Sequence, residues 1–549
     1  MTNRRFRLDF WSAVSLILLC TFLLFLVYPI GGLLKEAFFK DGAFTMDAFA
    51  QFFSKKHYYG TIGHSTLIGV SVTALSLLLG IPFSYFYSFY ELTGKKLIFV
   101  LCLLCTMSAP FIGAYAWILL MGNSGLLTGL LRAVGITGVS IYGFGGVVLV
   151  QVLKLFPLVV IYMNGAFRDI DNSLLEAAES MGCKGIERFK RIIMGLTMPT
   201  ILAAALLVFM RSFADFGTPV LIGRGYTTFP VLIYNEYLGE NGADFHFAAA
   251  VSVIAVLVTA AIFLAQKAAS NRFKFTINSL HPVAPKKPGK VAGILMNVYC
   301  YALLAVALLP QLYIINMSFR NYTNSILKPG YSLVNYQKAI EKNLFRALGN
   351  TLVISIAALA IILVIAVLIS YLVVRRSNFI NNLIDTISMM PYIMPGAVIG
   401  ISLVIAFSGK PFSLTGTLTI MIIALVIRRM PFTSRSATAA MMKIPISTEE
   451  AALSLGAPRA EAFTRITVPM MSSGIISGAV LSFVSIITEM SSGVILYKNS
   501  TMTLTIGTYT CITSGIYGVA AVFATVTTVL TVLCLILYLK ISKSEDFSV

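Results

Sequence analysis

Long apolar runs recur along the whole chain, and each is about as long as a helix needs to be to cross a lipid bilayer. The 549 residues are 58% hydrophobic and only 11% charged. That is too little charge to cover the surface of a soluble protein of this length. The runs predict an all-α integral membrane protein with about twelve transmembrane helices. We expect these helices near residues 10–33, 66–90, 97–121, 140–164, 199–222, 246–268, 291–317, 351–374, 380–408, 414–440, 471–497 and 515–541.

The basic residues predict which loops face the cytoplasm. The formal net charge is +19, but the positive charge lies largely between apolar runs, which indicates a membrane bias rather than a nucleic-acid partner. Arg4, Arg5 and Arg7 precede the first run and predict a cytoplasmic N-terminus with a retained first helix. The segment 270–290 contains prolines and basic residues but no acid, so we expect a cytoplasmic linker there. The loop 318–350 is basic although it is expected outside.

Cysteine and histidine give no sign of a disulfide framework or a metal centre. Cys102 and Cys105 form a C-x-x-C, but it lies inside the apolar stretch LCLLCTM with no acid, base or histidine beside it. The four histidines are scattered through the sequence. We therefore expect no metal site and no cofactor in this chain.

The two halves of the chain repeat each other in sequence. LLEAAESMGCKGIERFKRIIMG, from Leu174, aligns with TEEAALSLGAPRAEAFTRITVP, from Thr448. The same register, extended without gaps, pairs Pro157 with Pro431 and Asp215 with Glu489. An internal repeat of this kind is typical of transporters. It predicts two homologous six-helix halves.

Each copy reads as an amphipathic insertion between two membrane spans. We expect Glu176 to open a short helix, where its carboxylate complements the helix dipole, and Gly182 to end it. Ala177 and Ala178 give that helix a small, flat face. An ordinary cytoplasmic loop held by anionic lipid is the alternative, and two copies in one register argue against it.

These residues resemble the EAA loop of type I ABC importer permeases, E-A-A-x-x-x-G followed later by I-x-L-P. The second copy matches closely, with Val468 in place of leucine before Pro469, whereas the first has Met194 and Gly195 at its end. In that family the loop is a coupling helix that sits in a groove of the cytoplasmic ATPase. The resemblance implies an ATPase-coupling role for Glu176, Ala177, Ala178, Gly182, Glu450, Ala451, Ala452 and Gly456.

The resemblance covers nearly the whole chain and divides it into parts. It implies a first helix and extracytoplasmic loop at 1–59, a transmembrane domain at 60–269, the linker at 270–290, a seventh helix and loop at 291–344, a second transmembrane domain at 345–541 and a cytoplasmic tail at 542–549. Both termini would be cytoplasmic, in the inner membrane of a bacterium.

The segment from Ser212, SFADFGTPVLIGRGYTTFPVLIYNEYL, is similar to the corresponding stretch of fused ferric iron permeases. Related permeases for thiamine, 2-aminoethylphosphonate or polyamine are the alternatives. The sequence has no G-x-x-x-x-G-K-[ST] motif, so the chain is not expected to bind or hydrolyse ATP itself. The expected partners are a cytoplasmic ABC ATPase dimer, an extracytoplasmic substrate-binding protein and the lipid bilayer.

Two other classes of protein fit the sequence less well. An ion-coupled secondary transporter would need several paired acids inside the membrane. Asp215 and Glu489 are the clear cases within the expected spans. A membrane enzyme would need a nucleophile–base pair or a metal site, and no such pattern stands out.

Arg211, Asp215 and Glu489 are candidates for the translocation path. Arg211 lies about twelve residues into its expected span, roughly 18 Å deep, where an unpaired arginine costs at least about 2.5 kcal/mol. Asp215 follows one helical turn later, so we expect the two side chains to pair. Glu489 occupies the matching position of the repeat and would approach the same interface. The alternatives are a structural ion pair and a lining that offers a cation weak contacts.

Overall fold

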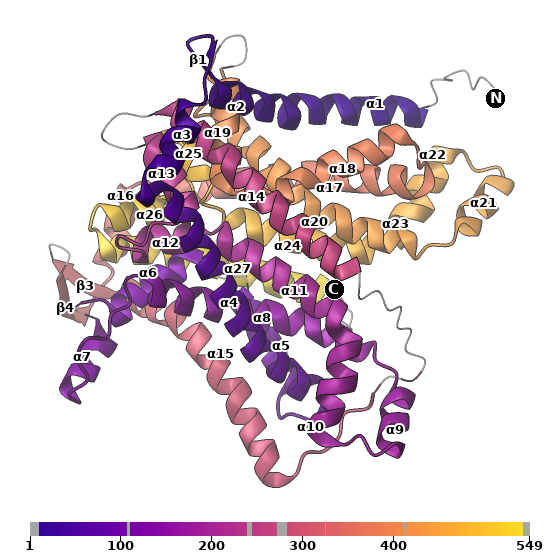
Figure 1. Ribbon diagram of the computed structural model, residues 1–549, viewed down its shortest axis with the longest axis horizontal. Coiled ribbons are helices and arrows are strands. Elements are labelled where there is room, and N and C mark those ends of the chain that lie inside the picture. Colours follow the sequence, from indigo (N-terminus) through magenta and orange to yellow (C-terminus); the bar gives the residue numbers. More distant parts are fainter. Residues whose placement is uncertain are drawn as a thin grey trace.

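The protein is a bundle of long helices with a few short elements at their ends (Figure 1). The computed structural model describes residues 10–106, 110–123, 125–238, 244–271, 281, 283–323, 326–409 and 413–541. The N-terminal arginines, linker residues 272–280 and 282, and the 542–549 tail lie outside these residues, as does part of the 97–121 span.

The first half of the chain runs to Asn271. Its helices are α1 (Phe10–Phe22), α2 (Tyr28–Phe38), α3 (Asp47–Ser54), α4 (Lys56–Phe89), α5 (Lys95–Thr106), α6 (Pro110–Met121), α7 (Leu126–Ala133), α8 (Phe144–Arg168), α9 (Asn172–Ser180), α10 (Gly185–Arg188), α11 (Met194–Phe213), α12 (Gly217–Ile222), α13 (Phe229–Leu238) and α14 (Phe245–Asn271). The π-helical segment Leu23–Val27 joins α1 to α2, and Phe189–Ile193 joins α10 to α11. Strands β1 (Phe39–Lys40) and β2 (Ala43–Phe44) pair antiparallel.

The second half begins at Lys290. Its helices are α15 (Lys290–Ser318), α16 (Val334–Glu341), α17 (Leu344–Arg375), α18 (Phe379–Ile393), α19 (Gly396–Phe407), α20 (Leu418–Met442), α21 (Ile446–Ser454), α22 (Arg459–Ala462), α23 (Val468–Met470), α24 (Ser472–Ile487), α25 (Gly493–Leu496), α26 (Leu504–Thr513) and α27 (Tyr517–Ile541). Phe463–Thr467 is π-helical and Asn499–Thr501 is a 3-10 turn. Strands β3 (Arg320–Thr323) and β4 (Ile326–Tyr331) form an antiparallel hairpin.

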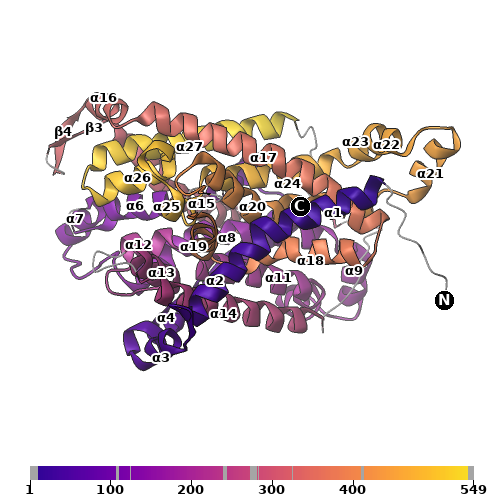
Figure 2. The same ribbon diagram turned by 90° about the horizontal axis from the view of Figure 1, so that it is seen from above.

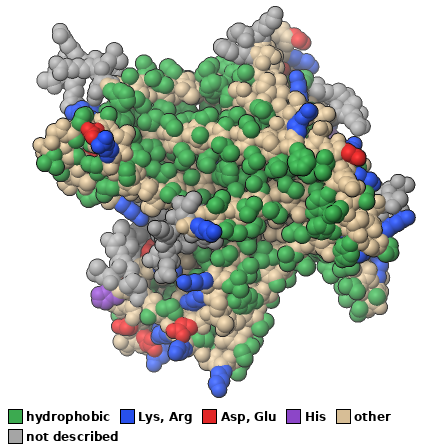
Figure 3. Space-filling view, turned by 180° about the vertical axis from the view of Figure 1, so that it is seen from behind, with side chains coloured by type: hydrophobic (Ala, Val, Ile, Leu, Met, Phe, Trp, Pro, Cys, Tyr) green, Lys and Arg blue, Asp and Glu red, His purple; other side chains and the backbone are tan. Residues whose placement is uncertain are grey.

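Most of the expected spans are present as helices of membrane length. Within the described residues, 9 helices are long and apolar enough to cross a membrane, or up to 11 if each of two bent pairs is one span. The counted helix nearest the expected 97–121 span is Phe111–Ala133, so that prediction overlaps it only in part. The expected span 414–440 corresponds to α20. Three arginines, Arg428, Arg429 and Arg435, lower its mean hydropathy. Figure 3 shows apolar side chains spread over a broad outer face, with most charges at its edges.

Three spans differ from the straight helices that the sequence predicted. The 380–408 span bends by 114° between α18 and α19, at Met394 and Pro395. The 199–222 span begins earlier, in α10, and ends at Phe213, before the short helix α12. The 471–497 span ends at Ile487, before the short helix α25, and α24 bends by 67° from the helix preceding it. Pro395 lies at the first of these breaks, where it interrupts helical hydrogen bonding. Asp215 and Glu489 each lie two residues beyond the last residue of α11 and α24.

The first helix of each half packs against the other half. Helices α1 and α2 contact α18, α17 and α19 of the second half, and α2 also contacts α14. Figure 2 shows α1 crossing above the second-half helices. Helix α15 contacts α5, α6 and α8 of the first half, as well as α27 (Figure 1). The two halves are therefore interlocked rather than placed side by side.

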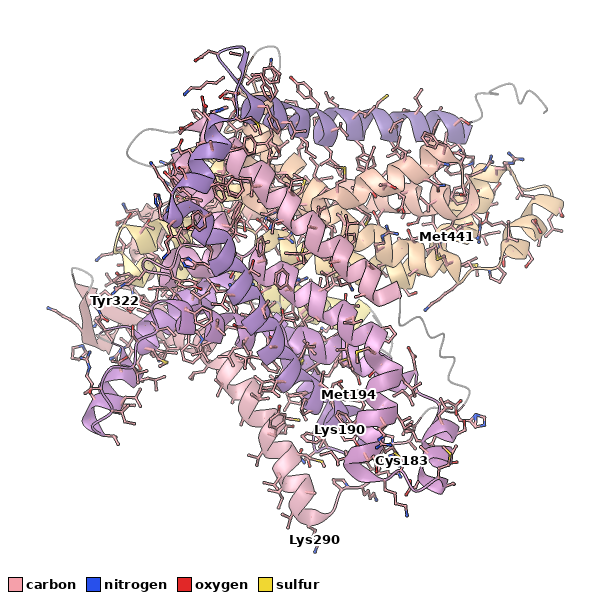
Figure 4. The ribbon with its side chains drawn as sticks, in the orientation of Figure 1. Cys183, Lys190, Met194, Lys290, Tyr322 and Met441 are labelled. Carbon is pink, nitrogen blue, oxygen red and sulfur yellow. The ribbon has the colours of Figure 1, made fainter. Side chains whose placement is uncertain are left out.

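The two EAA segments lie at the tips of separate arms. Figure 1 shows α21 and α22 at the end of one arm and α9 and α10 at the end of the other. Figure 4 shows Cys183 and Lys190 on the second of these arms, with Tyr322 at the opposite end of the molecule. Helix α8 packs on α11 in one arm and α20 packs on α24 in the other. Arg211 of α11 contacts the ring of Phe432 of α20 between them.

Candidate functional site

The EAA segment of the first half is a compact helix–turn–helix. Asp171 caps α9, because its Oδ1 accepts the backbone N–H of Ser173 at 2.9 Å. The helix ends at Gly182, which has a φ of 85° that glycine adopts without steric cost. The N–H of Cys183 then donates to the carbonyl of Ala178 at 2.9 Å, the bond that closes a Schellman turn.

The second half builds the same turn at the matching positions. Helix α21 is as long as α9, and Gly456 follows it with a φ of 91°. The N–H of Ala457 donates to the carbonyl of Ala452 at 3.1 Å. A π-helical segment follows in both halves, at Phe189–Ile193 and Phe463–Thr467. The sequence repeat is therefore also a repeat of backbone geometry, and we call the two segments 171–193 and 445–467 the coupling loops.

The side chains of these loops differ in one respect from the expectation. Glu176 and Glu450 are the fifth residues of α9 and α21, so they do not open these helices. Asp171 performs the capping at the first helix instead. The first alanine of each motif is exposed and the second is buried, at Ala178 and Ala452. One alanine thus holds the loop to its own arm while the carboxylate faces outward.

A large apolar side chain stands exposed at each loop tip. Met181 is 80% exposed and Leu455 is 89% exposed, and the two occupy matching positions of the repeat. The sequence analysis missed them, although an apolar residue directly before the helix-ending glycine is visible in both copies. The nearby Arg191 and Arg465 are engaged within the loops, with Glu187 and Glu461, each at 3.0 Å. The tips therefore offer apolar surface that the described residues do not cover.

The centre of the molecule holds Glu489 between two arginines. Its carboxylate is 3% exposed and pairs with Arg428 and Arg429 of α20. It also accepts the N–H of Ser492 at 3.1 Å, at the start of α25. The sequence analysis named Glu489 but neither arginine.

Asp215 does not pair with Arg211 as expected. Its Oδ2 accepts from Nε2 of Gln151 at 2.9 Å, and its Oδ1 accepts the N–H of Gly217 at 3.2 Å. Ser212 donates in turn to Gln151 at 2.5 Å. The pairing fails because α11 ends at Phe213, so the one-turn spacing that would bring Arg211 and Asp215 together is lost.

Arg211 reaches across to the second half instead. Its guanidinium carbon lies 5.8 Å from the centre of the Phe432 ring, on α20. Tyr392 of α18 packs edge-on against the same ring, with 5.8 Å between ring centres. A cation over an aromatic face is favourable but leaves the charge without a counterion.

Lys154 of α8 is the first-half counterpart of Arg428. The register that pairs Asp215 with Glu489 also pairs Lys154 with Arg428. Lys154 lies within electrostatic range of Asp215 and Arg211 of its own half and of Arg429 and Glu489 of the other half. We call the group Lys154, Arg211, Asp215, Arg428, Arg429 and Glu489 the central charge cluster. Within the described residues, no group of three or more His, Cys, Asp or Glu could hold a metal ion.

Comparison with known proteins identifies the family. A model described as a binding-protein-dependent transport system inner membrane component matches residues 76–274 and again residues 362–544. The chain belongs to this family. It is an ABC importer permease subunit with the family domain present twice, and it is a multi-pass inner membrane protein.

Two of the relatives that match along most of this permease are assigned to ferric transport. The ferric transport system permease protein FbpB of Actinobacillus pleuropneumoniae is 24% identical over 518 residues, which cover 93% of this chain and 75% of the relative. A Haemophilus influenzae protein assigned to a ferric transport system is 25% identical over 496 residues, covering 88% and 78%.

A third relative matches one half. A Salmonella typhimurium permease protein, PhnU, assigned to 2-aminoethylphosphonate transport, is 25% identical over 268 residues, which cover 48% of this chain and 92% of the relative.

Proposed function

We propose that this permease couples through its two loops to a separate cytoplasmic ATPase dimer and imports ferric iron delivered by an extracytoplasmic binding protein. The observation that carries the coupling role is the repeated loop geometry, with Met181 and Leu455 exposed at matching tips. Exposed apolar surface of this kind favours a protein partner. Two equivalent tips suit a partner that is itself a symmetric dimer.

The coupling role is tested by removing the apolar tips. Met181→Ser with Leu455→Ser should abolish co-purification of the ATPase, because each loop loses its most exposed apolar side chain. The matched control is Leu174→Ser, since Leu174 is also exposed on α9 but lies before the turn. Glu176→Lys with Glu450→Lys should weaken ATPase binding as well. Normal co-purification and transport by the tip variant would refute the role.

The proposed substrate rests on the relatives that span this chain. Two of the relatives that match along most of the chain are assigned to ferric transport, whereas the phosphonate permease matches only half of it. Cells lacking the permease should lose uptake of radiolabelled ferric iron presented with the binding protein. Normal iron uptake with a defect in growth on 2-aminoethylphosphonate would assign the chain to the second candidate. Thiamine and polyamine uptake in the same cells test the remaining alternatives.

The proposed orientation places both termini, the 270–290 linker and both coupling loops in the cytoplasm. The proposed transmembrane domains, 60–269 and 345–541, each hold most of one family match. Lys287 is exposed, so Lys287→Cys gives a labelling site within the linker. In intact cells, a membrane-impermeant thiol reagent should leave the introduced thiol unmodified until the cells are opened. Labelling from outside would invert the orientation.

A further inference from the structure

The charges at the centre of the permease do not balance. The central charge cluster contains four basic side chains, Lys154, Arg211, Arg428 and Arg429, and two acids. Glu489 is shared between two arginines, and Asp215 is hydrogen-bonded to the neutral Gln151. The cluster therefore carries a net positive charge where the two halves meet.

Donors in this cluster are left without acceptors. The Arg211 guanidinium contacts the Phe432 ring. Among the described residues, it has no hydrogen bond and no ion pair. The Nε of Arg429 is buried with no hydrogen-bond partner there. Uncompensated arginine at membrane depth is costly, so such residues are kept where they serve a passing or bound charge.

The cluster lies where the spans of both halves are broken. Asp215 and Glu489 stand in the links from α11 to α12 and from α24 to α25. Gly396, at the start of α19, lies against the Arg428 guanidinium and Ser491, and its missing side chain makes room for them. Transporters commonly place their substrate sites at breaks of this kind, near the middle of the membrane.

We propose that the central charge cluster attracts an anion during transport. The permeant species is then an anionic oxyacid or an anionic complex of the metal. This proposal rests on the proposed function, and it adds that ferric iron passes as a negatively charged chelate rather than as the bare trivalent cation. The excess of basic groups repels bare Fe³⁺ and stabilises a carboxylate- or phosphate-bearing complex, because Coulomb interactions are strong where water is scarce.

The electrostatic potential at the cluster can be measured with charged thiol reagents, in the absence of any transported substrate. Ser491 is partly exposed beside Arg428, so Ser491→Cys, in a chain whose seven native cysteines are replaced, places a thiol at the cluster. The purified permease is treated with a methanethiosulfonate bearing either a sulfonate or a trimethylammonium group. Each forms a mixed disulfide and releases methanesulfinate. After correction for reaction with a free small thiol, the anionic reagent should react at least about tenfold faster.

Matched variants show whether the preference comes from the named residues. Arg211→Gln with Lys154→Gln, added to the Ser491→Cys chain, should reduce the preference by about tenfold, whereas Arg211→Lys should retain it. Equal rates, faster reaction with the cationic reagent, no reaction with either, or a preference unchanged by the double variant would each overturn the proposal. Normal iron uptake in cells that lack the permease would refute the substrate proposal but would not change these modification rates. The two proposals can therefore be refuted independently.

Discussion

Among the side chains of the central charge cluster, Glu489 is expected to contribute most to the stability of the fold. Its carboxylate is nearly inaccessible and is the counterion shared by Arg428 and Arg429. Glu489→Gln keeps the shape but leaves two buried guanidinium groups without a counterion, a change that costs about 3–5 kcal/mol. We expect much less of the variant to be recovered folded in detergent, with a clearly lower melting temperature by light scattering.

Asp215→Asn is the matched comparison at the other acid. Asp215 is partly exposed and hydrogen-bonds to Gln151 and to a backbone N–H, and asparagine can keep one of these bonds. The loss should be about 1–2 kcal/mol, since a hydrogen bond rather than a buried ion pair is weakened. Equal melting temperatures for the two variants would contradict the assignment of Glu489 as the shared counterion.

The sequence could place both acids at the centre but not their partners. The repeat register brought Asp215 and Glu489 together, and applied to the cations it would also have found Lys154 and Arg428. Arg211 was paired with Asp215 on the assumption of a continuous helix, and α11 stops between them. Residue spacing predicts contacts only where the backbone stays regular.

At the scale of single elements, the turn of each coupling loop depends on one glycine. Gly182 and Gly456 have left-handed backbone angles, and no atom lies within 4 Å of where a side chain would begin. Gly182→Ala with Gly456→Ala should therefore strain each turn by about 1–2 kcal/mol without a steric clash. We expect ATPase binding to weaken about five- to tenfold in a pull-down titration.

Gly195→Ala is the control for this prediction. Gly195 lies in α11 with equally open space but a helical backbone, where alanine is favourable. It should leave ATPase binding unchanged. An equal effect of all three changes would mean that the glycines matter for some reason other than the turn.

Helix positions were largely predictable, whereas helix breaks were not. Apolar runs such as those of α8, α14 and α17 define their spans because each is long and nearly free of charge. The bend between α18 and α19 also lies in an apolar run, so averaged hydropathy passes over it. Pro395 and Gly396 were the available signal, since both disrupt a continuous helix. Helix breaks depend on individual residues such as proline and glycine. Hydropathy averaged over many residues does not show their effect.

At the scale of the whole molecule, the interlocked first helices hold the halves together. Trp11 of α1 packs against two second-half rings, with its centre 4.3 Å from that of Tyr371 and 5.0 Å from that of Phe463. Ser15 donates to the side chain of the buried Asn381 at 2.7 Å. In return, Tyr299 of α15 donates to the carbonyl of Leu79, in α4, at 2.9 Å. The polypeptide linker is therefore not the main connection between the halves.

This arrangement predicts that a permease cut in its linker stays assembled. A protease site inserted between residues 272 and 280 should be cleaved to give two fragments on a denaturing gel. In mild detergent, however, the fragments should elute together from a sizing column, because each carries a helix packed within the other.

Trp11→Ala with Ser15→Ala removes an aromatic cluster and a membrane-embedded hydrogen bond, the latter worth about 0.6–2 kcal/mol. These changes should lower the temperature at which the cut fragments separate. Ile17→Ala is the control, since Ile17 lies on the same helix but is largely exposed. Separation of the unmodified fragments as soon as the linker is cut would show that the crossing helices do not hold the halves together.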